Sequence, residues 1–449
     1  MRYRSAMTDG VPPTVTTDPT AILRSRQYAV LLVFGSMLGV LVAAVAYLYL
    51  QGVSEAQQYV FDTLPEDLGF DTVPSWWSIP VLAISGLLVG CTIHVLPGTS
   101  GHEPAEGFTS AGAVEPIDLP GIVIASFTTL ALGVVLGPEA PLIAIGSGMG
   151  VLAVRLVKRD APAQATLVIG AAGSFAAIST LLGSPLAGAF LLMEASGLGG
   201  AVMSMVLVPG LFAAGIGSLI FIGLDNWVGV GTFSLTAPDV TPAGTPTVAE
   251  FGWAIVIGLS AAVFGAAISR LARSAQRAVA GRRVALTPVA GVVIGLLVLV
   301  FVETTDRSPA NVLFSGQDQL PLLIEHAADW SVGALVVLLC CKGLAYAAAL
   351  SAFRGGPVFP GMFLGAVGGI ALSHLPGLET IPGAAMGIGA MTVAMLGLPL
   401  TSVLLASSFL SGGGLQLTPL IIVAVGVSYM TRAYLIPSDE PSTVSAAVA

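Results

Sequence analysis

The 449-residue chain is far more apolar than a water-soluble protein, because 55% of its residues are hydrophobic, 9% are charged and the mean hydropathy is +0.92. A soluble domain carries about 25% charged residues. The formal net charge of −9 comes with no sustained basic groove, which excludes nucleic acid as a partner, and the three cysteines have neither disulfide nor metal spacing. The composition therefore predicts an all-α, polytopic membrane protein without a cofactor or a bound metal.

The first half of the chain is expected to enter the membrane from the cytoplasm. Residues 1–27 read as a polar tail, and residues 28–50 form an apolar stretch longer than the roughly 20 residues that cross a bilayer. Four arginines precede this stretch, and Lys and Arg favour the cytoplasmic side of a membrane. Residues 51–74 contain five acids and no base, so they are expected outside. The first transmembrane half is expected over residues 28–224.

The second half is expected to run through the membrane in the opposite direction. Residues 225–250 contain acids and no base, and they are expected to form an extracytoplasmic linker. The apolar residues 251–269 are followed by five arginines between positions 270 and 283, which indicates an inner loop. This half is expected over 251–436, followed by a tail at 437–449, with both termini in the cytoplasm. Inverted repeats with broken helices are typical of transporters, whose binding site lies between the halves.

One helix-breaking phrase occurs in both halves. Residues 137–146 read GPEAPLIAIG, and residues 356–365 read GPVFPGMFLG, 219 residues later. Two further matches follow nearly the same offset: LGSPL at 182–186 with LGLPL at 396–400, and SGH at 100–102 with SGQ at 315–317. Three matches in one order at nearly one offset predict two equivalent halves.

The repeated phrase predicts two half-helices that start inside the membrane. Pro141 and Pro360 suit the first turn of a helix, where a missing N–H costs nothing, so the helices are expected to start at about these residues. A helix N-terminus has unpaired N–H groups and a partial positive charge. Two of them aimed at one point therefore bind an anion without a lysine, and weakly enough for the anion to leave.

Glu139 distinguishes the first copy of the phrase from the second. A carboxylate in hydrocarbon is costly, and such residues are functional by default. Glu139 is therefore expected to be a gate and proton acceptor that occupies an anion position when charged and swings out when protonated; the alternative is a structural glutamate that caps a helix. Ser100 is expected to donate its hydroxyl to the anion, with a turn serine as the alternative. Lys342 and Arg354 are expected to extend to the inner face of the membrane, with a role in the electrostatics of the inner pore as the alternative.

The order of these motifs resembles the CLC family of chloride channels and chloride/proton exchangers, over about residues 28–435. The family's G-S-G-I-P, G-(K/R)-E-G-P, P-L-A-G ending in glutamate, and G-x-F-x-P look like TSGHEP at 99–104, GPEAP at 137–141, PLAG at 185–188 through Glu194, and GPVFP at 356–360. The resemblance implies an inverted-repeat fold with broken and re-entrant helices, assembled as a homodimer. It also implies an anion site made of Ser100, Gly101, Gly137, Ala140, Gly356, Val358, Phe359 and the pore tyrosine Tyr434, for which Tyr429 is a second choice.

Three positions depart from the family pattern. Pro138 and Pro357 remove N–H groups that the family's motifs offer, so fewer amide donors remain for the anion. Ala195 stands where the family's exchangers carry a second, inward-facing glutamate. This substitution favours a channel or uncoupled transport over tight proton coupling.

The expected function is the movement of chloride or a similar small anion across the plasma (inner) membrane, by a multi-pass protein in contact with lipid that is not an enzyme. The alternative is a proton-coupled antiporter for chloride, fluoride or nitrate, with protons as a second partner. A remoter alternative is an inverted-repeat transporter for a cation or a larger anion. The remotest is a rhomboid-like intramembrane serine protease, suggested by GTSG at 98–101 with His374 as the base.

Overall fold

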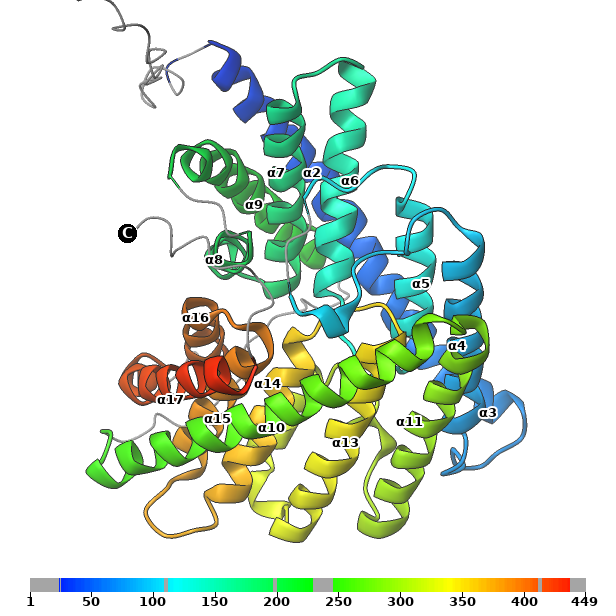
Figure 1. Cartoon of the computed structure of the whole chain (residues 1–449), viewed down its shortest axis with the longest axis vertical. Coiled ribbons are helices and arrows are strands. Elements are labelled where there is room, and N and C mark those ends of the chain that lie inside the picture. Colours follow the sequence, from blue (N-terminus) through cyan, green and yellow to red (C-terminus); the bar gives the residue numbers. More distant parts are fainter. Residues whose placement is uncertain are drawn as a thin grey trace, which may run out of the picture.

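A computed structural model describes Arg24 and residues 26–108, 112–196, 200–228, 245–410 and 414–436 of the chain (Figure 1). Almost all of the expected N-terminal tail, most of the expected linker at 225–250 and the expected C-terminal tail lie outside the described residues. The described part is helical, and eight of its helices are long and apolar enough to cross a membrane. The expected polytopic all-α architecture is confirmed.

Each half contributes one series of helices. The first half contains α2 (Arg26–Gln58), the π-helical turn Tyr59–Thr63, α3 (Leu64–Asp67), α4 (Ser78–Val95), the 3₁₀ turn Pro104–Glu106, α5 (Leu119–Ala131), α6 (Glu139–Val157), α7 (Ala163–Leu182), α8 (Pro185–Ala195) and α9 (Gly200–Val228). The second half contains α10 (Val248–Ala280), α11 (Arg283–Thr305), the 3₁₀ turn Pro309–Asn311, α12 (Gln319–Glu325), the 3₁₀ turn Ala327–Asp329, α13 (Val332–Ala352), α14 (Val358–Leu372), α15 (Thr380–Leu396), α16 (Pro399–Phe409) and α17 (Gly414–Leu435).

Several elements of the two series correspond to each other at nearly the offset of the repeated phrases. Helices α2 and α10, which open the halves, are both 33 residues long. Helices α8 and α16 are both 11 residues long and begin at the proline of the repeated Leu-Gly-x-Pro. The glycine of each copy ends the preceding helix in the left-handed conformation, with φ of 60° at Gly183 and 73° at Gly397. The same sequence therefore turns the chain in the same way in both halves.

Glycines let the broken helices pack closely against the helices that follow them. A methyl group on Gly146 of α6 would lie 2.4 Å from the backbone oxygen of Gly173 in α7. A methyl group on Gly365 of α14 would lie 2.2 Å from the backbone oxygen of Gly387 in α15. Gly146 and Gly365 are 219 residues apart, the offset of the repeated phrase. Close packing through small residues is a common way to associate helices in a membrane, and here it sets the position of each half-helix.

The halves pack on each other through equivalent helices. Figure 1 shows α4 of the first half beside α11 of the second, and α8 beside α16. Glycines again permit the close contact of α4 with α11, because a methyl group on Gly291 would lie 2.1 Å from the backbone oxygen of Leu82. The starts of α6 and α14, which are also equivalent, meet between these two contacts and form the candidate site.

The half-helices start two residues earlier than expected. Helix α6 begins at Glu139 and α14 at Val358, each directly after the proline that follows the first glycine of the phrase. Pro141 and Pro360 occupy the third helical position instead of the first. This position is also tolerated, because the first four N–H groups of a helix have no partner within the helix. As a result, Glu139 lies in the first turn of α6.

Gly365→Ala is expected to destabilise the protein by about 1–3 kcal/mol, because the new methyl group must displace the backbone of α15. Gly368→Ala is the matched control on the same helix, since a methyl group there meets no atom within 4 Å. Thermal unfolding of the two variants in detergent checks this difference. Equal unfolding temperatures would show that the α14–α15 contact does not depend on glycine.

Candidate functional site

The two repeated phrases are bound directly to each other. The N–H of Gly137 donates to the carbonyl of Gly356 at 2.8 Å, and the N–H of Gly356 donates to the carbonyl of Gly137 at 2.6 Å, which forms an isolated antiparallel bridge. Helices α6 and α14 begin within two residues of this bridge. The prediction that the two helix starts converge on one point is confirmed.

Glu139 fills the space beside this bridge. Its side chain is completely buried, and its Oε1 accepts a hydrogen bond of 2.9 Å from the N–H of Phe359, in the first turn of the opposite half-helix. Its Oε2 has no hydrogen-bond partner among the described residues. A methyl group on Gly356 would lie 1.8 Å from Oε2, and one on Gly137 would lie 2.2 Å from it. The carboxylate therefore occupies space that is free only because both neighbours are glycines.

Few backbone donors remain around the carboxylate. The N–H groups of Gly137 and Gly356 are used by the bridge, so they are not available to an anion. Pro138 and Pro357 have no N–H group. The first-turn amides of the two half-helices are those of Glu139, Ala140, Val358 and Phe359, and that of Phe359 donates to the carboxylate. The hydroxyl of Tyr346 donates to the carbonyl of Pro357 at 2.8 Å and fixes the start of α14.

Two cavities border this region. One, of about 540 Å³, is lined by Leu136 and Pro138, and we call it the first cavity. The other, of about 360 Å³, is lined by Ala140 and Gly355, and we call it the second cavity. Glu139 lines neither of them and lies in the chain between Pro138 and Ala140. The two linings share no residue, and the buried carboxylate lies between them along the chain.

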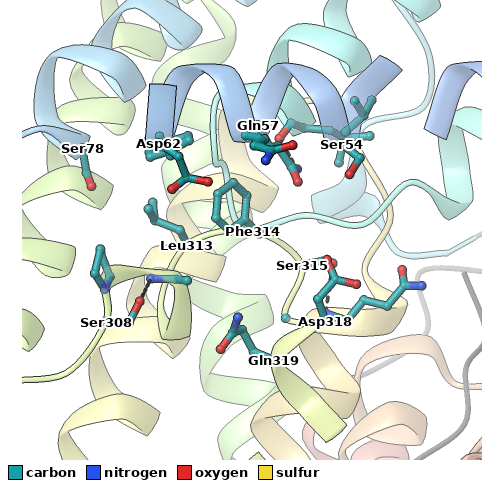
Figure 2. Close-up of a pocket in the computed structure, with 18 of the residues that line it drawn as sticks. Ser54, Gln57, Asp62, Ser78, Ser308, Leu313, Phe314, Ser315, Asp318 and Gln319 are labelled. Carbon is teal, nitrogen blue, oxygen red and sulfur yellow. Dashed lines mark hydrogen bonds between the residues drawn. The ribbon is translucent and has the colours of Figure 1, made fainter. Parts of the chain in front are cut away.

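The first cavity is polar and carries two carboxylates. Figure 2 shows Asp62 and Asp318 lining it together with serine and glutamine side chains from both halves of the chain. Burial raises the pKa of Asp318 above its ordinary value, because a carboxylate loses hydration there. Residues 315–317, the SGQ copy, also line this cavity.

Residues 100–102, the SGH copy, line the second cavity. The SGH and SGQ copies, which match each other between the two halves of the sequence, therefore line different cavities. Ser100 is 1% exposed, adopts a positive φ of 55°, and its Oγ has no hydrogen-bond partner among the described residues. A serine that served only the turn would bond to the turn. An unpartnered hydroxyl on the wall of a cavity fits a ligand-binding role better.

The comparisons with known proteins agree with this geometry. Residues 105–433 match the family described as "Voltage gated chloride channel". The chain belongs to this family. A protein of Salmonella newport named as the ion-transport protein YfeO is 29% identical over 385 residues, which cover 84% of this chain and 87% of that protein. YfeO of Salmonella schwarzengrund is 28% identical over 382 residues, with the same coverage.

Solved structures of CLC proteins share the fold. The crystal structure of a slow cyanobacterial Cl⁻/H⁺ antiporter superposes with a TM-score of 0.75 at 18% identity, over 90% of this chain and 94% of that one. The crystal structure of a CLC-type fluoride/proton antiporter superposes with a TM-score of 0.67 at 19% identity, over 90% and 96% of the two chains. Identities this low establish the fold alone. With the family match, they make this chain a CLC-type anion transporter or channel and not an enzyme.

Two cations of this CLC chain lie where the sequence does not predict them. Lys342 is completely buried, and its Nζ donates to the carbonyls of Asn311, Val312 and Leu313 at 3.0–3.1 Å and to that of Phe314 at 3.3 Å. Arg354 is 4% exposed and donates to backbone carbonyls and to Glu103. The expectation that both side chains extend to the membrane face is wrong, because each finds its hydrogen-bond acceptors inside the protein.

Two candidates taken from the family pattern lie away from Glu139. Tyr434 is in the last turn of α17 and is 84% exposed, and neither it nor Tyr429 lines either cavity. Glu194, at the end of α8, accepts hydrogen bonds from the N–H groups of Leu400 and Thr401 at 3.0 and 2.7 Å, and from the Thr401 hydroxyl at 2.6 Å. Glu194 therefore caps the start of α16, the equivalent helix of the other half.

The geometry also argues against the protease alternative. The two ring nitrogens of His374 lie 3.0 and 3.2 Å from the carbonyls of Ile370 and Trp330. Ser100 has no bond to His374, since its Oγ has no partner among the described residues. A serine nucleophile needs a base within hydrogen-bond reach, and His374 does not provide one here.

Glu194→Ala is expected to lower the free energy of unfolding by about 0.5–2 kcal/mol, because it removes the cap of α16. Glu194→Gln keeps one acceptor oxygen and is expected to lose less. Glu115→Ala is a suitable control, since the Glu115 side chain is 54% exposed and forms its ion pair with the exposed Arg155. Thermal unfolding in detergent checks the order, and a loss at Glu115 as large as that at Glu194 would contradict the capping role.

Proposed function

We propose that this protein passes chloride or a similar small anion between the first and second cavities, and that Glu139 is the gate. The observation that carries this proposal is the hydrogen bond from Phe359 N–H to the Glu139 carboxylate, at the point where two helix starts meet. Amides at helix starts favour a negative charge. A buried carboxylate held by such amides occupies the place that a permeating anion would take.

Protonation is the step that opens this gate in our proposal. A neutral Glu139 accepts a weaker hydrogen bond from Phe359 and gains little from the helix starts, so its side chain can leave. The amides of Glu139, Ala140, Val358 and Phe359 are then free to bind an anion. Because Pro138 and Pro357 supply no donors, the anion is held loosely, as rapid conduction requires. Ser100 and Gly101 would bind the anion on the side of the second cavity.

Uncoupled anion movement is the mode that the residues favour. Ala195 cannot carry a proton, and the neighbouring Glu194 is engaged in capping α16. The alternative is proton-coupled exchange of chloride, fluoride or nitrate. Its support is that two structural relatives are described as Cl⁻/H⁺ and fluoride/proton antiporters. Homodimeric assembly, placement in the plasma (inner) membrane and cytoplasmic termini complete the proposal.

Glu139→Gln is expected to abolish the pH dependence of anion flux, because glutamine mimics a permanently protonated gate. Chloride efflux from liposomes, measured from pH 5 to pH 8, provides the test. An unchanged pH profile in the variant would show that Glu139 is not the gate.

Gly356→Ala provides an independent variant that keeps a glutamate at position 139. The new methyl group would lie 1.8 Å from Oε2, so the carboxylate must move out while the helices stay. We expect flux at high pH to rise toward that of Glu139→Gln. A pH profile like that of the unmodified protein would mean that the position of the carboxylate does not control flux.

The mode of transport is tested by reading chloride and protons at the same time. Liposomes with a chloride gradient and no proton gradient are expected to release chloride without moving protons uphill, because no second acid replaces Ala195. Proton pumping at a fixed ratio to chloride would establish the antiporter alternative. An absence of any anion flux would reject the proposed function as a whole.

A further inference from the structure

An open groove of about 390 Å³ lies between α10, α11 and α13, and we call it the outer groove. Helices α10 and α11 each pack on α13 but touch each other little, so α13 forms the floor of the groove and the other two helices form its walls (Figure 1). None of the residues that line it lines the first or the second cavity. The outer groove is therefore separate from the candidate site.

The lining of the outer groove is apolar and partly uncovered. Leu271, Val289, Val293 and Leu344 all line it, and each is between 43% and 53% exposed. Ser351 is the one polar residue of the lining. Contiguous apolar patches that remain exposed mark interaction sites or contact with a membrane. Because the helices that form this groove cross the membrane, its lining is in reach of lipid chains.

The groove has the depth of one leaflet of a bilayer. Its lining on α11 runs from Leu286, in the first turn of the helix, to Leu297. This distance is about 16 Å at the rise of an α-helix. The hydrocarbon core of a bilayer is about 30 Å thick. The groove therefore extends from one face of the membrane to about its middle, which is the space that one acyl chain of a phospholipid fills.

The end of the groove at the membrane face is polar. Arg282 directly precedes α11, one turn before the apolar lining starts, and it is exposed. Ser351 lies at the same end, because the neighbouring residues Arg283 and Arg354 both form ion pairs with Glu103. The groove thus has a polar end and an apolar end, like a lipid.

The polar end also carries an excess of positive charge. Arg277 and Arg282 are exposed and form no ion pair with any described residue. The sequence contains no Asp or Glu between positions 251 and 302, whereas it has five arginines between 270 and 283. Basic residues at a membrane face attract lipids with negative headgroups. The apolar lining accepts the chain of any phospholipid, and the charge selects an anionic one.

We propose that the outer groove binds one anionic phospholipid. One acyl chain lies on α13 between α10 and α11, and the phosphate of the headgroup pairs with Arg282. The bound lipid joins two helices that otherwise touch each other little, and it stabilises the helix that leads directly to Gly356 of the bridge. This inference rests on the placement of the chain in a membrane and not on the gate at Glu139, so the two proposals can fail separately.

Thermal unfolding of the detergent-solubilised full chain tests the headgroup. Phosphatidylglycerol is expected to raise the unfolding temperature more than phosphatidylcholine with the same acyl chains, because a ligand that binds the folded state stabilises it. Arg282→Gln is expected to remove most of this difference. Arg277→Gln is the matched control, since Arg277 is exposed in the last turn of α10 but does not line the groove. It is expected to keep the difference.

A second variant tests the groove itself. Ala348→Phe places a ring on the floor of the groove, so both lipids are expected to raise the unfolding temperature less. Native mass spectrometry is expected to detect one molecule of phosphatidylglycerol fewer on this variant. Val336→Phe is the control on the same helix, because Val336 is 47% exposed and lies outside the lining. It is expected to leave the stabilisation and the number of bound lipids unchanged.

Four outcomes would overturn the proposal. Equal stabilisation of the unmodified protein by the two lipids would reject an anionic headgroup. Equal losses in Arg282→Gln and Arg277→Gln would mean that only the general charge of this membrane face acts. An unchanged number of bound lipids in Ala348→Phe would reject the groove as the site. A changed oligomeric state in Ala348→Phe, without a change in lipid, would show that a second copy of the chain covers the groove.

Discussion

Two helix starts from opposite halves of this protein are joined by backbone hydrogen bonds, and the rest of the site depends on this contact. Gly137 and Gly356 form this bridge through their backbones, and neither residue has a Cβ. The same absence leaves the space that the Glu139 carboxylate fills. If either residue carried a side chain, the carboxylate would have to leave its place at the Phe359 amide. The bridge therefore determines both where the helix starts point and where the carboxylate lies.

The close helix contacts outside the site hold the starts of α6 and α14 in position. Gly146 and Gly365 bring each half-helix against its successor at the same place in the repeat. The contacts of α4 with α11 and of α8 with α16 join the halves through equivalent helices. In lipid, a broken helix is tolerated only where protein or a cavity surrounds the break. The buried, glycine-rich packing around α6 and α14 meets that condition and lets unpaired amides persist in the interior.

The sequence predicts the parts of this site that depend on local patterns. The repeated phrase indicates the two half-helices, and a lone acid in an apolar stretch indicates Glu139. The sequence does not predict the hydrogen-bond acceptors of Lys342 and Arg354. The acceptors of Arg354 include Thr99 and Glu103, more than 250 residues earlier, and no local pattern reports such a contact. The membrane-face prediction for these cations rests on the usual behaviour of long basic side chains, which holds only when no acceptor is available inside. Glu194 is a similar case, because its partners lie in the other half.

Glu139 and Arg354 are two charged residues that break the internal symmetry of the repeat. A perfectly symmetric inverted repeat would offer an anion the same surroundings from both sides. At the offset of 219 residues, Glu139 corresponds to Val358 and Arg354 corresponds to Val135, so the carboxylate beside the bridge and the guanidinium in the lining of the second cavity each occur in one half of the repeat alone. The first cavity instead carries Asp62 and Asp318. In the proposed path, an anion that crosses from the first cavity to the second would move from carboxylates, past a carboxylate that must be displaced or protonated, to a guanidinium. In that proposal the control of flux is concentrated at Glu139, because this carboxylate lies where the two halves of the repeat meet.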